Sequence, residues 1–318
     1  MSDVKKTGSD ERMAKKPGPN GWIILDKPRT LGSTQAVGAV KRNLREGGYA
    51  KTKVGHGGTL DPLAEGVLPI ALGEATKLAG RMLDASKIYE FTVRFGEETD
   101  TLDTQGAVID TSDVRPELDQ ILAVLPQFTG PIDQVPPAYS ALKVDGRRAY
   151  DLARAGEVVE LKTRAVTIHA LTVVGGVKEG NEITLRAHVS KGTYIRSLAR
   201  DIARTLGTCG HVTYLRRTKA GPFLQSDAIS LDKLNEVSSG APLKDLLLPL
   251  EAGLDDIPAL NLNQTDAQAV REGRVLSELP QPSGLYCAML DNVPVALVEI
   301  SDGATKIVRG FNLPDVAE

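Results

Sequence analysis

The residues best suited to chemistry lie in one glycine-rich segment, residues 55–66, which contains four glycines. Glycine lets a backbone take positive φ angles and approach a ligand closely. The segment also holds one imidazole, His56, and one carboxylate beside a proline, Asp61-Pro62. It lacks the Gly-Lys-Ser/Thr ending of a phosphate-binding loop and the dinucleotide fingerprint. The segment predicts a ligand-contacting loop that presents Asp61, although an Asp-Pro pair alone more often merely starts a turn.

Other motifs follow and precede this loop in a fixed order. They are Gly21 to Pro28, Lys87 to Tyr89, Gly96 to Asp103, Pro136 to Lys143, Lys191 to Leu198 and Leu215 to Thr218. Together with the glycine-rich loop, these segments resemble the TruB-type family of bacterial tRNA pseudouridine-55 synthases over residues 21–225. The terminal segment resembles the PUA-like RNA-binding domain of that family more weakly.

Two positions depart from the family pattern. The family usually has Lys-Pro-x-Gly-x-Thr-Ser, whereas here Lys27-Pro28 is followed by Arg29-Thr30-Leu31-Gly32-Ser33, so that the glycine is shifted by two positions. Glu65 stands where a threonine is common. Neither departure changes a group that the resemblance makes catalytic.

The resemblance implies that the substrate is the T stem-loop of tRNA, and that uridine 55 is isomerised without a cofactor. The bond from N1 to C1′ breaks, the base turns, and C1′ joins C5. Asp61 is expected to act either as nucleophile or as proton acceptor, and both roles use its ionised form. Arg196 is expected to keep Asp61 charged and oriented, and Tyr89 to stack on a flipped-out uracil. The plainer alternatives are a surface arginine and a core tyrosine.

Further contacts are expected around these catalytic groups. His56 is expected to enter the distorted RNA loop, with simple backbone hydrogen bonding as its alternative. Asp103 is placed near the base or in support of the site. Contact with RNA or packing beside the pocket is expected for Lys27, Lys143, Tyr194 and Lys191. Phosphate contacts are expected from Arg147, Arg148, Arg154, Arg216, Arg217 and Lys219.

Charge is distributed in blocks along a chain whose net charge is −3. Residues 1–53 carry 12 Lys and Arg against 5 Asp and Glu, and residues 140–220 carry 15 against 7. The two remaining segments are acidic. An acidic protein can therefore present a basic face to RNA, although scattered solvated charge explains the same counts.

The elements that position these residues follow from hydrophobic patterning. Strands are expected at residues 22–25, 67–72, 89–95, 166–174, 183–189, 211–217, 286–290 and 295–300. Helices are expected from Ser33 or Thr34 to Leu44, and over 74–83, 118–125, 194–206 and 265–271, with a loop at 131–137. Because no regular βαβ repeat appears, we expect an α+β fold whose sheet is largely antiparallel. The expected divisions are a disordered tail (1–20), a catalytic domain (21–250) and a β-rich PUA-like RNA-binding domain (251–318).

Composition excludes several classes of protein. No apolar stretch is long enough for a membrane helix, and the N-terminus lacks the apolar core of a signal peptide. Two distant cysteines, Cys209 and Cys287, do not make a disulfide framework, so a cytoplasmic protein is expected. Four unpaired histidines give no metal motif, and no metal site is expected. A monomer is expected.

Two alternatives to a stand-alone tRNA synthase remain. The first is a guide-RNA-dependent synthase acting on ribosomal RNA with partner proteins; the run Leu63 to Pro69 favours the bacterial type that needs no guide RNA. The second is a tRNA-binding folding factor whose catalytic groups are incidental, which the presence of Asp61, Tyr89 and Arg196 disfavours.

Overall fold

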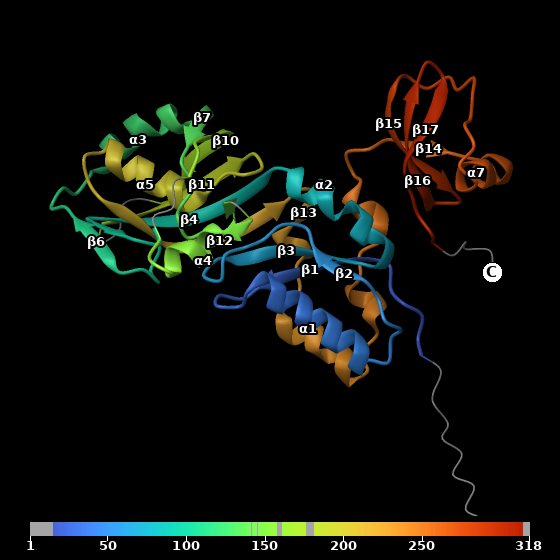
Figure 1. The fold of residues 1–318 in the computed structure, drawn as a ribbon, viewed down its shortest axis with the longest axis horizontal. Coiled ribbons are helices and arrows are strands. Elements are labelled where there is room, and N and C mark those ends of the chain that lie inside the picture. Colours follow the sequence, from blue (N-terminus) through green and yellow to red (C-terminus); the bar gives the residue numbers. More distant parts are fainter. Residues whose placement is uncertain (1–14, 141, 145, 158–160, 176–180, 314–318) are drawn as a thin grey trace, which may run out of the picture.

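The computed structural model describes residues 15–140, 142–144, 146–157, 161–175 and 181–313. Its largest element is a mixed sheet in the order β1-β3-β12-β4-β11-β10-β7 (Figure 1). The strands are β1 (Gly21–Lys27), β3 (Glu65–Leu72), β12 (Gly210–Ala220), β4 (Lys87–Phe95), β11 (Glu182–Val189), β10 (Arg164–Val173) and β7 (Gly130–Gln134). Within this path only the β3–β12 pair is parallel. The expected α+β fold with a largely antiparallel sheet is confirmed.

The two faces of this sheet have separate cores. Ile23 and Leu25 of β1 pack into a cluster with α1 (Ser33–Glu46) and α5 (Ile195–Thr205), whereas Trp22 and Ile24 pack into a second cluster on the other face. Side chains of a strand alternate between faces. The continuous apolar run of β1 is therefore explained by burial on both sides.

Smaller elements complete the larger body. Short strands pair at its edges or apart from it: β2 (Val54–His56), β5 (Glu97–Thr99), β6 (Val108–Thr111), β8 (Lys143–Val144), β9 (Arg147–Arg148) and β13 (Phe223–Leu224). The helices are α2 (Ala79–Asp84), α3 (Leu118–Val124), α4 (Ala149–Arg154) and α6 (Leu231–Asn235), with short 3₁₀ turns at 73–78, 125–128, 225–227, 236–239, 243–246 and 250–253.

A second sheet, in the order β14-β15-β16-β17, has its own core against α7 (Gln264–Arg271). Its strands are β14 (Ala259–Asn261), β15 (Gly284–Leu290), β16 (Val293–Ser301) and β17 (Ala304–Gly310). This C-terminal module contacts the larger body because Cys287, Leu297 and Phe311 join the hydrophobic cluster around Trp22. Lys77 Nζ also donates to the Gly310 carbonyl at 2.9 Å.

Three local expectations were wrong. Residues 130–134 form β7 rather than a loop, because β7 is an edge strand on which a proline is tolerated. The helix expected at 74–83 is divided into a 3₁₀ turn and α2. Helix α1 is capped at Gly32, whose N–H donates to Gln35 Oε1, rather than by the hydroxyl of Ser33 or Thr34.

Residues 1–14 of the expected disordered tail (1–20) lie outside the described part of the chain. Residues 15–20 are described, and they pack against the body. Lys16 exchanges backbone hydrogen bonds with Gly48 and Ala50, and Asn20 Oδ1 accepts from the Glu74 N–H at 2.8 Å.

Candidate active site

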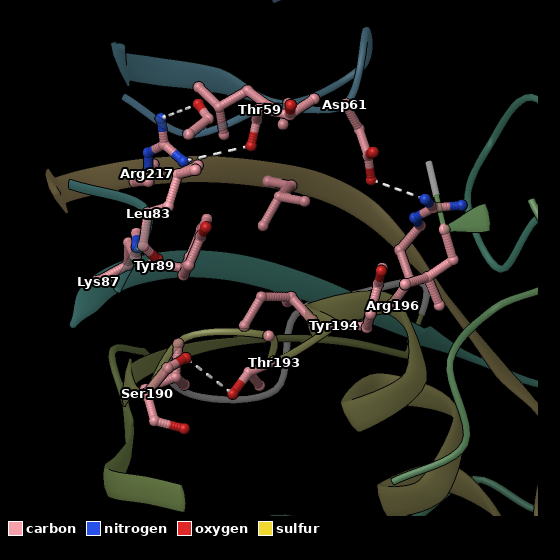
Figure 2. Close-up of a pocket in the computed structure, with 18 residues that line it drawn as sticks. Thr59, Asp61, Leu83, Lys87, Tyr89, Ser190, Thr193, Tyr194, Arg196 and Arg217 are labelled. Atoms are coloured by element: carbon pink, nitrogen blue, oxygen red, sulfur yellow. Dashed lines mark hydrogen bonds and ion pairs between the residues drawn. The ribbon is translucent and has the colours of Figure 1, made fainter. Parts of the chain in front are cut away.

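A cavity of about 340 Å³ opens beside the glycine-rich loop. Its wall is formed by residues 58–61 of the loop, by Tyr89 of β4, by residues 189–190 and 192–196 before and within α5, and by Leu215 and Arg217 of β12. Figure 2 shows Asp61 and Arg196 at one end of the cavity and Arg217 and Lys87 at the other. This volume falls in the usual range for small-ligand pockets.

The loop that carries Asp61 is held by buried side chains from separate elements. Arg217 of β12 donates to the carbonyls of Gly58 and Thr59 at 3.1 and 3.3 Å (Figure 2). Ser33, at the start of α1, donates from Oγ to the Leu60 carbonyl and accepts from the Leu60 N–H, both at 2.9 Å. These bonds fix the backbone immediately before Asp61 without engaging its carboxylate.

The residues after Asp61 are held from β1 and the turn that follows it. Lys27 Nζ donates to the carbonyls of Pro28, Leu31 and Pro62 at 3.1, 2.8 and 3.3 Å. The Thr30 N–H donates to the same Pro62 carbonyl at 2.7 Å. Thr30 has a φ of 75°, a conformation that is an outlier for a β-branched residue. The residue that replaces the family's glycine therefore adopts a glycine-like backbone conformation, with strain.

The end of the loop shows why a glycine is required there. Gly66 has a φ of 98°, and a Cβ at this position would overlap the carbonyl oxygen of Arg217. The close approach lets β3 pair with β12 in parallel at Glu65 and Gly66. The end of the glycine-rich loop is therefore paired with β12 beside the cavity.

Arg196 lies against Asp61, with Nη2 at 2.8 Å from Oδ2. The arginine side chain is 6% exposed, whereas the aspartate side chain is 39% exposed and faces the cavity. Arg196 also donates from Nη1 to the Thr101 carbonyl at 2.8 Å and from Nη2 to the Tyr139 carbonyl at 3.0 Å. A buried guanidinium with fixed partners holds the carboxylate in one orientation.

The position of Arg196 is unfavourable for an ordinary helix. It lies in the first turn of α5, where the helix dipole disfavours a cation. Gln134 secures this helix start, because its Nε2 donates to the Tyr194 carbonyl at 3.1 Å and its Oε1 accepts from the Tyr194 N–H at 2.8 Å. The start of α5 thus places Arg196 against Asp61 of the glycine-rich loop.

Asp103 supports Arg196 from the other side. Its Oδ2 lies 3.6 Å from Nη1 of Arg196, and its Oδ1 accepts from the Thr101 hydroxyl and the Gln105 N–H at 2.6 and 3.0 Å. Asp103 is 7% exposed and does not line the cavity beside Tyr89. Its position suits support of the ion pair rather than contact with a base.

Two tyrosines contribute aromatic surface to the cavity, Tyr89 from β4 and Tyr194 from the start of α5 (Figure 2). Tyr89 is only partly buried, and it also packs against the core below. Burial raises the pKa of Tyr194 above its ordinary value, so its hydroxyl stays neutral at physiological pH. An aromatic wall next to a fixed carboxylate is suited to a planar base next to its sugar.

Two lysines near the loop have strongly lowered pKa values. Burial lowers the pKa of Lys27 from 10.5 to about 8, although the nearby Asp61 carboxylate opposes this change. Burial, together with the charge of Arg217, lowers the pKa of Lys87 to about 8. Lys87 donates to the carbonyls of Met82, Leu83 and Ala85 at 2.8, 2.7 and 2.6 Å.

Three residues expected to contact RNA have other partners in the structure. Lys27 is fully buried and bonded to carbonyls, so it supports the loop from below. Arg217 is 1% exposed and its hydrogen bonds go to backbone carbonyls, which leaves it no access to a phosphate. Arg216 pairs with Asp26 and Glu65 at 2.7 and 3.0 Å.

The remaining expected contacts lie around the cavity rather than in it. His56 is half-buried on β2, its Nδ1 has no partner among the described residues, and burial and Arg217 lower its pKa. Lys191 is exposed and pairs with Asp84 at 2.9 Å. Arg147 pairs with Glu157, and Arg154 lies over the Tyr150 ring.

The last of these positions belong to β12 and to a short hairpin. Lys219 is half-buried on β12 and lines a separate recess beside Ser86. Lys143 and Arg148 occupy paired backbone positions in the β8–β9 register. The hairpin and α4 thus carry several of the expected basic residues together.

The sequence patterns do not reveal the roles of Ser33, Gln134 and Lys87. Ser33 follows the shifted glycine, where a helix cap is the ordinary expectation, and Gln134 lies in a proline-rich stretch that predicts a loop. Only Lys87 gives a signal, because it begins the motif that contains Tyr89.

Among the described residues, no group of three or more His, Cys, Asp or Glu side chains could hold a metal ion. No helix in the described part of the chain is long and apolar enough to cross a membrane.

Comparisons with known proteins agree with this geometry. Residues 45–195 match the model of the TruB family pseudouridylate synthase N-terminal domain, and residues 196–255 match that of the tRNA pseudouridylate synthase B C-terminal domain. The chain is 69% identical over 302 residues to tRNA pseudouridine synthase B of Novosphingobium aromaticivorans, covering 94% of this chain and 99% of that protein. It is 56% identical to the Zymomonas mobilis protein of the same name, with coverages of 92% and 96%.

A solved structure resembles the whole fold. It is described as an H/ACA RNP bound to a substrate RNA containing 2′-deoxyuridine, with a TM-score of 0.70, 26% identity, and coverage of 93% of this chain and 86% of that one. The glycine-rich loop and the cavity beside it both lie within the matched residues. The chain therefore belongs to the TruB family of pseudouridylate synthases and is an RNA isomerase.

Proposed function

We propose that this protein converts uridine 55 in the T loop of tRNA to pseudouridine, with Asp61 as the catalytic group. The tRNA substrate is supported by the names of the relatives that are 69% and 56% identical to the chain. The observation that carries the role of Asp61 is its geometry: a partly exposed carboxylate, 2.8 Å from a buried guanidinium, at the edge of a cavity walled by Tyr89.

The reaction balances within the nucleotide itself. The N1–C1′ bond breaks, the uracil turns about the cavity, and the C5–C1′ bond forms; the proton leaves C5 and N1 gains one. No electrons are transferred to another molecule. Asp61 either attacks the nucleotide as a nucleophile or accepts a proton from the sugar, and both roles use its ionised form.

The remaining residues of the cavity receive the flipped base. A uridine inside the T loop must leave its stack to reach Asp61, and an aromatic face such as Tyr89 is a natural receiver for it. Tyr194 adds a second aromatic group beside Arg196. His56 stands outside the cavity on β2, from where it is proposed to hold the distorted RNA loop open.

We further propose that the protein acts on tRNA without a guide RNA and that its C-terminal module, residues 259–310, binds RNA. Relatives named tRNA pseudouridine synthase B cover almost all of the chain, whereas the H/ACA ribonucleoprotein is only 26% identical. The separate sheet and core of the module support the proposal that it is a PUA-like domain.

Tritium release from 5-tritiated uridine in a bare tRNA transcript tests the proposal. The wild type is compared with Asp61→Asn, and a second transcript has cytidine in place of uridine 55. Release by the wild type only, and only from the first transcript, is expected. Release from both transcripts would show that a uridine other than uridine 55 is the target. Release that requires added RNA would favour a guide-dependent enzyme. Binding of tRNA without any release would favour a folding factor.

A further inference from the structure

A second cavity, of about 760 Å³, lies at the C-terminal end of α1 and is lined by basic side chains. Its lining residues are Lys15, Lys41, Leu44, Arg45, Tyr49, Ala50, Lys51, Thr52, Lys53 and Val54. Five of these residues are Lys or Arg and none is Asp or Glu. We call this cavity the basic groove.

The cations of the basic groove are largely uncompensated. Within the described part of the chain, Lys15, Lys41 and Lys51 have no carboxylate at ion-pair distance, and Arg45 pairs only with its neighbour Glu46 at 3.3 Å. A cation in the last turn of a helix is explained by the helix dipole, which accounts for Arg45. It does not account for lysines that lie on two other segments.

The groove has a defined wall and floor. The segment around Lys16 is tied to the loop after α1, because the Lys16 N–H donates to the Gly48 carbonyl and the Ala50 N–H donates to the Lys16 carbonyl. Lys16 Nζ also lies 4.9 Å from the centroid of the Tyr49 ring. Leu44 and Val54 belong to the main core and form the floor.

The groove lies beyond reach of the target nucleotide but on the same body as the site. Helix α1 has 14 residues, so its two ends are roughly 20 Å apart at about 1.5 Å per residue. Its first residue, Ser33, is bonded to Leu60 beside Asp61, and its last turns line the groove. Lys53 precedes His56 by a strand length of roughly 10 Å.

We propose that the basic groove binds the phosphodiester backbone of the same tRNA at a segment away from the flipped nucleotide. This inference rests on the proposed function. A cluster of lysines and arginines whose lining contains no carboxylate matches the regular negative charge of an RNA backbone. Such contacts position the RNA and add affinity without reading sequence.

Charge reversal in the groove tests this inference. Lys41→Glu/Arg45→Glu changes the helix side and Lys51→Glu/Lys53→Glu changes the loop side. Lys233→Glu/Lys244→Glu is the matched control, because it changes net charge by the same amount at exposed positions outside the groove. Filter binding to unmodified full-length tRNA is measured over a range of salt concentrations, with the thermal midpoint recorded to confirm folding.

Each groove variant is expected to weaken tRNA binding by roughly tenfold or more. The slope of log affinity against log salt should fall by about 2, because each variant removes two cations that neutralise phosphates. The control should leave both quantities within about twofold of the wild type, since its positions do not line the groove. Groove variants that behave like the control would overturn the inference. An equal loss of affinity in all three variants would overturn it too, because net charge alone would then explain the effect.

The result is separable from a failure of the proposed function. If the groove variants weaken tRNA binding but the wild type releases no tritium, RNA binding by the groove is supported and the proposed isomerase activity on uridine 55 is rejected. If the wild type releases tritium normally and the groove variants bind tRNA as well as the wild type does, only the inference about the groove is rejected.

Discussion

Arg196 and Asp61 meet across two elements that are 135 positions apart in the chain, and only one of the two is exposed to the cavity. The arginine is enclosed by the carbonyls of Thr101 and Tyr139, and it therefore cannot follow the carboxylate if the loop moves. Orientation of Asp61 depends on both partners being held independently.

Replacing Arg196 by lysine is expected to slow catalysis on the order of 10²-fold while leaving tRNA affinity within a few-fold, because a lysine keeps the charge but not the planar fork of donors. Single-turnover tritium release at saturating enzyme measures the chemical step, and filter binding measures affinity. Equal rates for Arg196→Lys and the wild type would show that charge alone is sufficient.

Replacing Ser33 by alanine removes both hydrogen bonds to Leu60 and is expected to slow the chemical step by roughly tenfold or more, since the backbone beside Asp61 loses its anchor. Thr305→Val is the matched control, because Thr305 is a buried residue whose hydroxyl likewise accepts from a backbone N–H, that of Leu276 at 2.9 Å, but in the C-terminal module. Both variants should lose about 1 kcal/mol of stability. If both slow the reaction equally, the effect of Ser33 is not local.

Activity is expected to decline as pH rises through about 8, where Lys27 and Lys87 lose their protons. A neutral amine has two N–H donors and cannot serve the three carbonyls that each lysine now holds. The pKa of Lys27 in the unfolded chain is near 10.5, so between pH 8 and 10.5 the unfolded state binds more protons and this group makes unfolding less favourable as pH rises.

Unfolding driven by Lys27 therefore cannot explain the decline. Rates and thermal midpoints measured across neutral and alkaline pH test this expectation, with Lys27→Met as the comparison variant. Lys27→Met should be slower at neutral pH and should show a smaller alkaline decline. A wild-type rate that stays constant above pH 8 would contradict the expectation.

Replacing Thr30 by glycine is expected to stabilise the protein by about 1 kcal/mol, because glycine adopts a φ of 75° without the strain of a β-branched residue. The bond from the residue 30 N–H to the Pro62 carbonyl is a backbone bond and is retained. Urea unfolding measures the change, and Thr30→Ala serves as the control that removes the branch but not the Cβ. A loss of stability in Thr30→Gly would mean that side-chain contacts outweigh the strain.

Replacing Tyr89 by phenylalanine should preserve stacking, whereas Tyr89→Leu should lose about 1–3 kcal/mol of interaction with the base. The loss is expected in the rate of the chemical step, because the base reaches Tyr89 only after it has flipped. Single-turnover rates of the two variants, compared at equal thermal stability, separate stacking from core packing. Equal rates for Tyr89→Phe and Tyr89→Leu would assign Tyr89 to packing.

Patterns in the chain were sufficient to predict most of the larger sheet and the loop that carries Asp61. Alternation in residues 89–95 and the apolar runs at 22–25 and 67–72 correspond to β4, β1 and β3, because burial on one or both faces dictates residue type at a strand's period. Local patterns did not predict secondary structure correctly where the tertiary environment determines it. Residues 130–134 are a strand only because they lie at the edge of a sheet assembled from distant segments.

The sequence by itself determined which chemical groups are present: an aspartate in a glycine-rich loop, an arginine beginning a helix and an aromatic residue on a strand. Tertiary structure alone decided their roles. Basic residues of similar type became an ion-pair partner in Arg196, a buried support in Arg217 and an exposed wall of the basic groove in Lys51. The physical reason is that a cation's function depends on its burial and on the acceptors around it, and those acceptors come from segments far away in the chain.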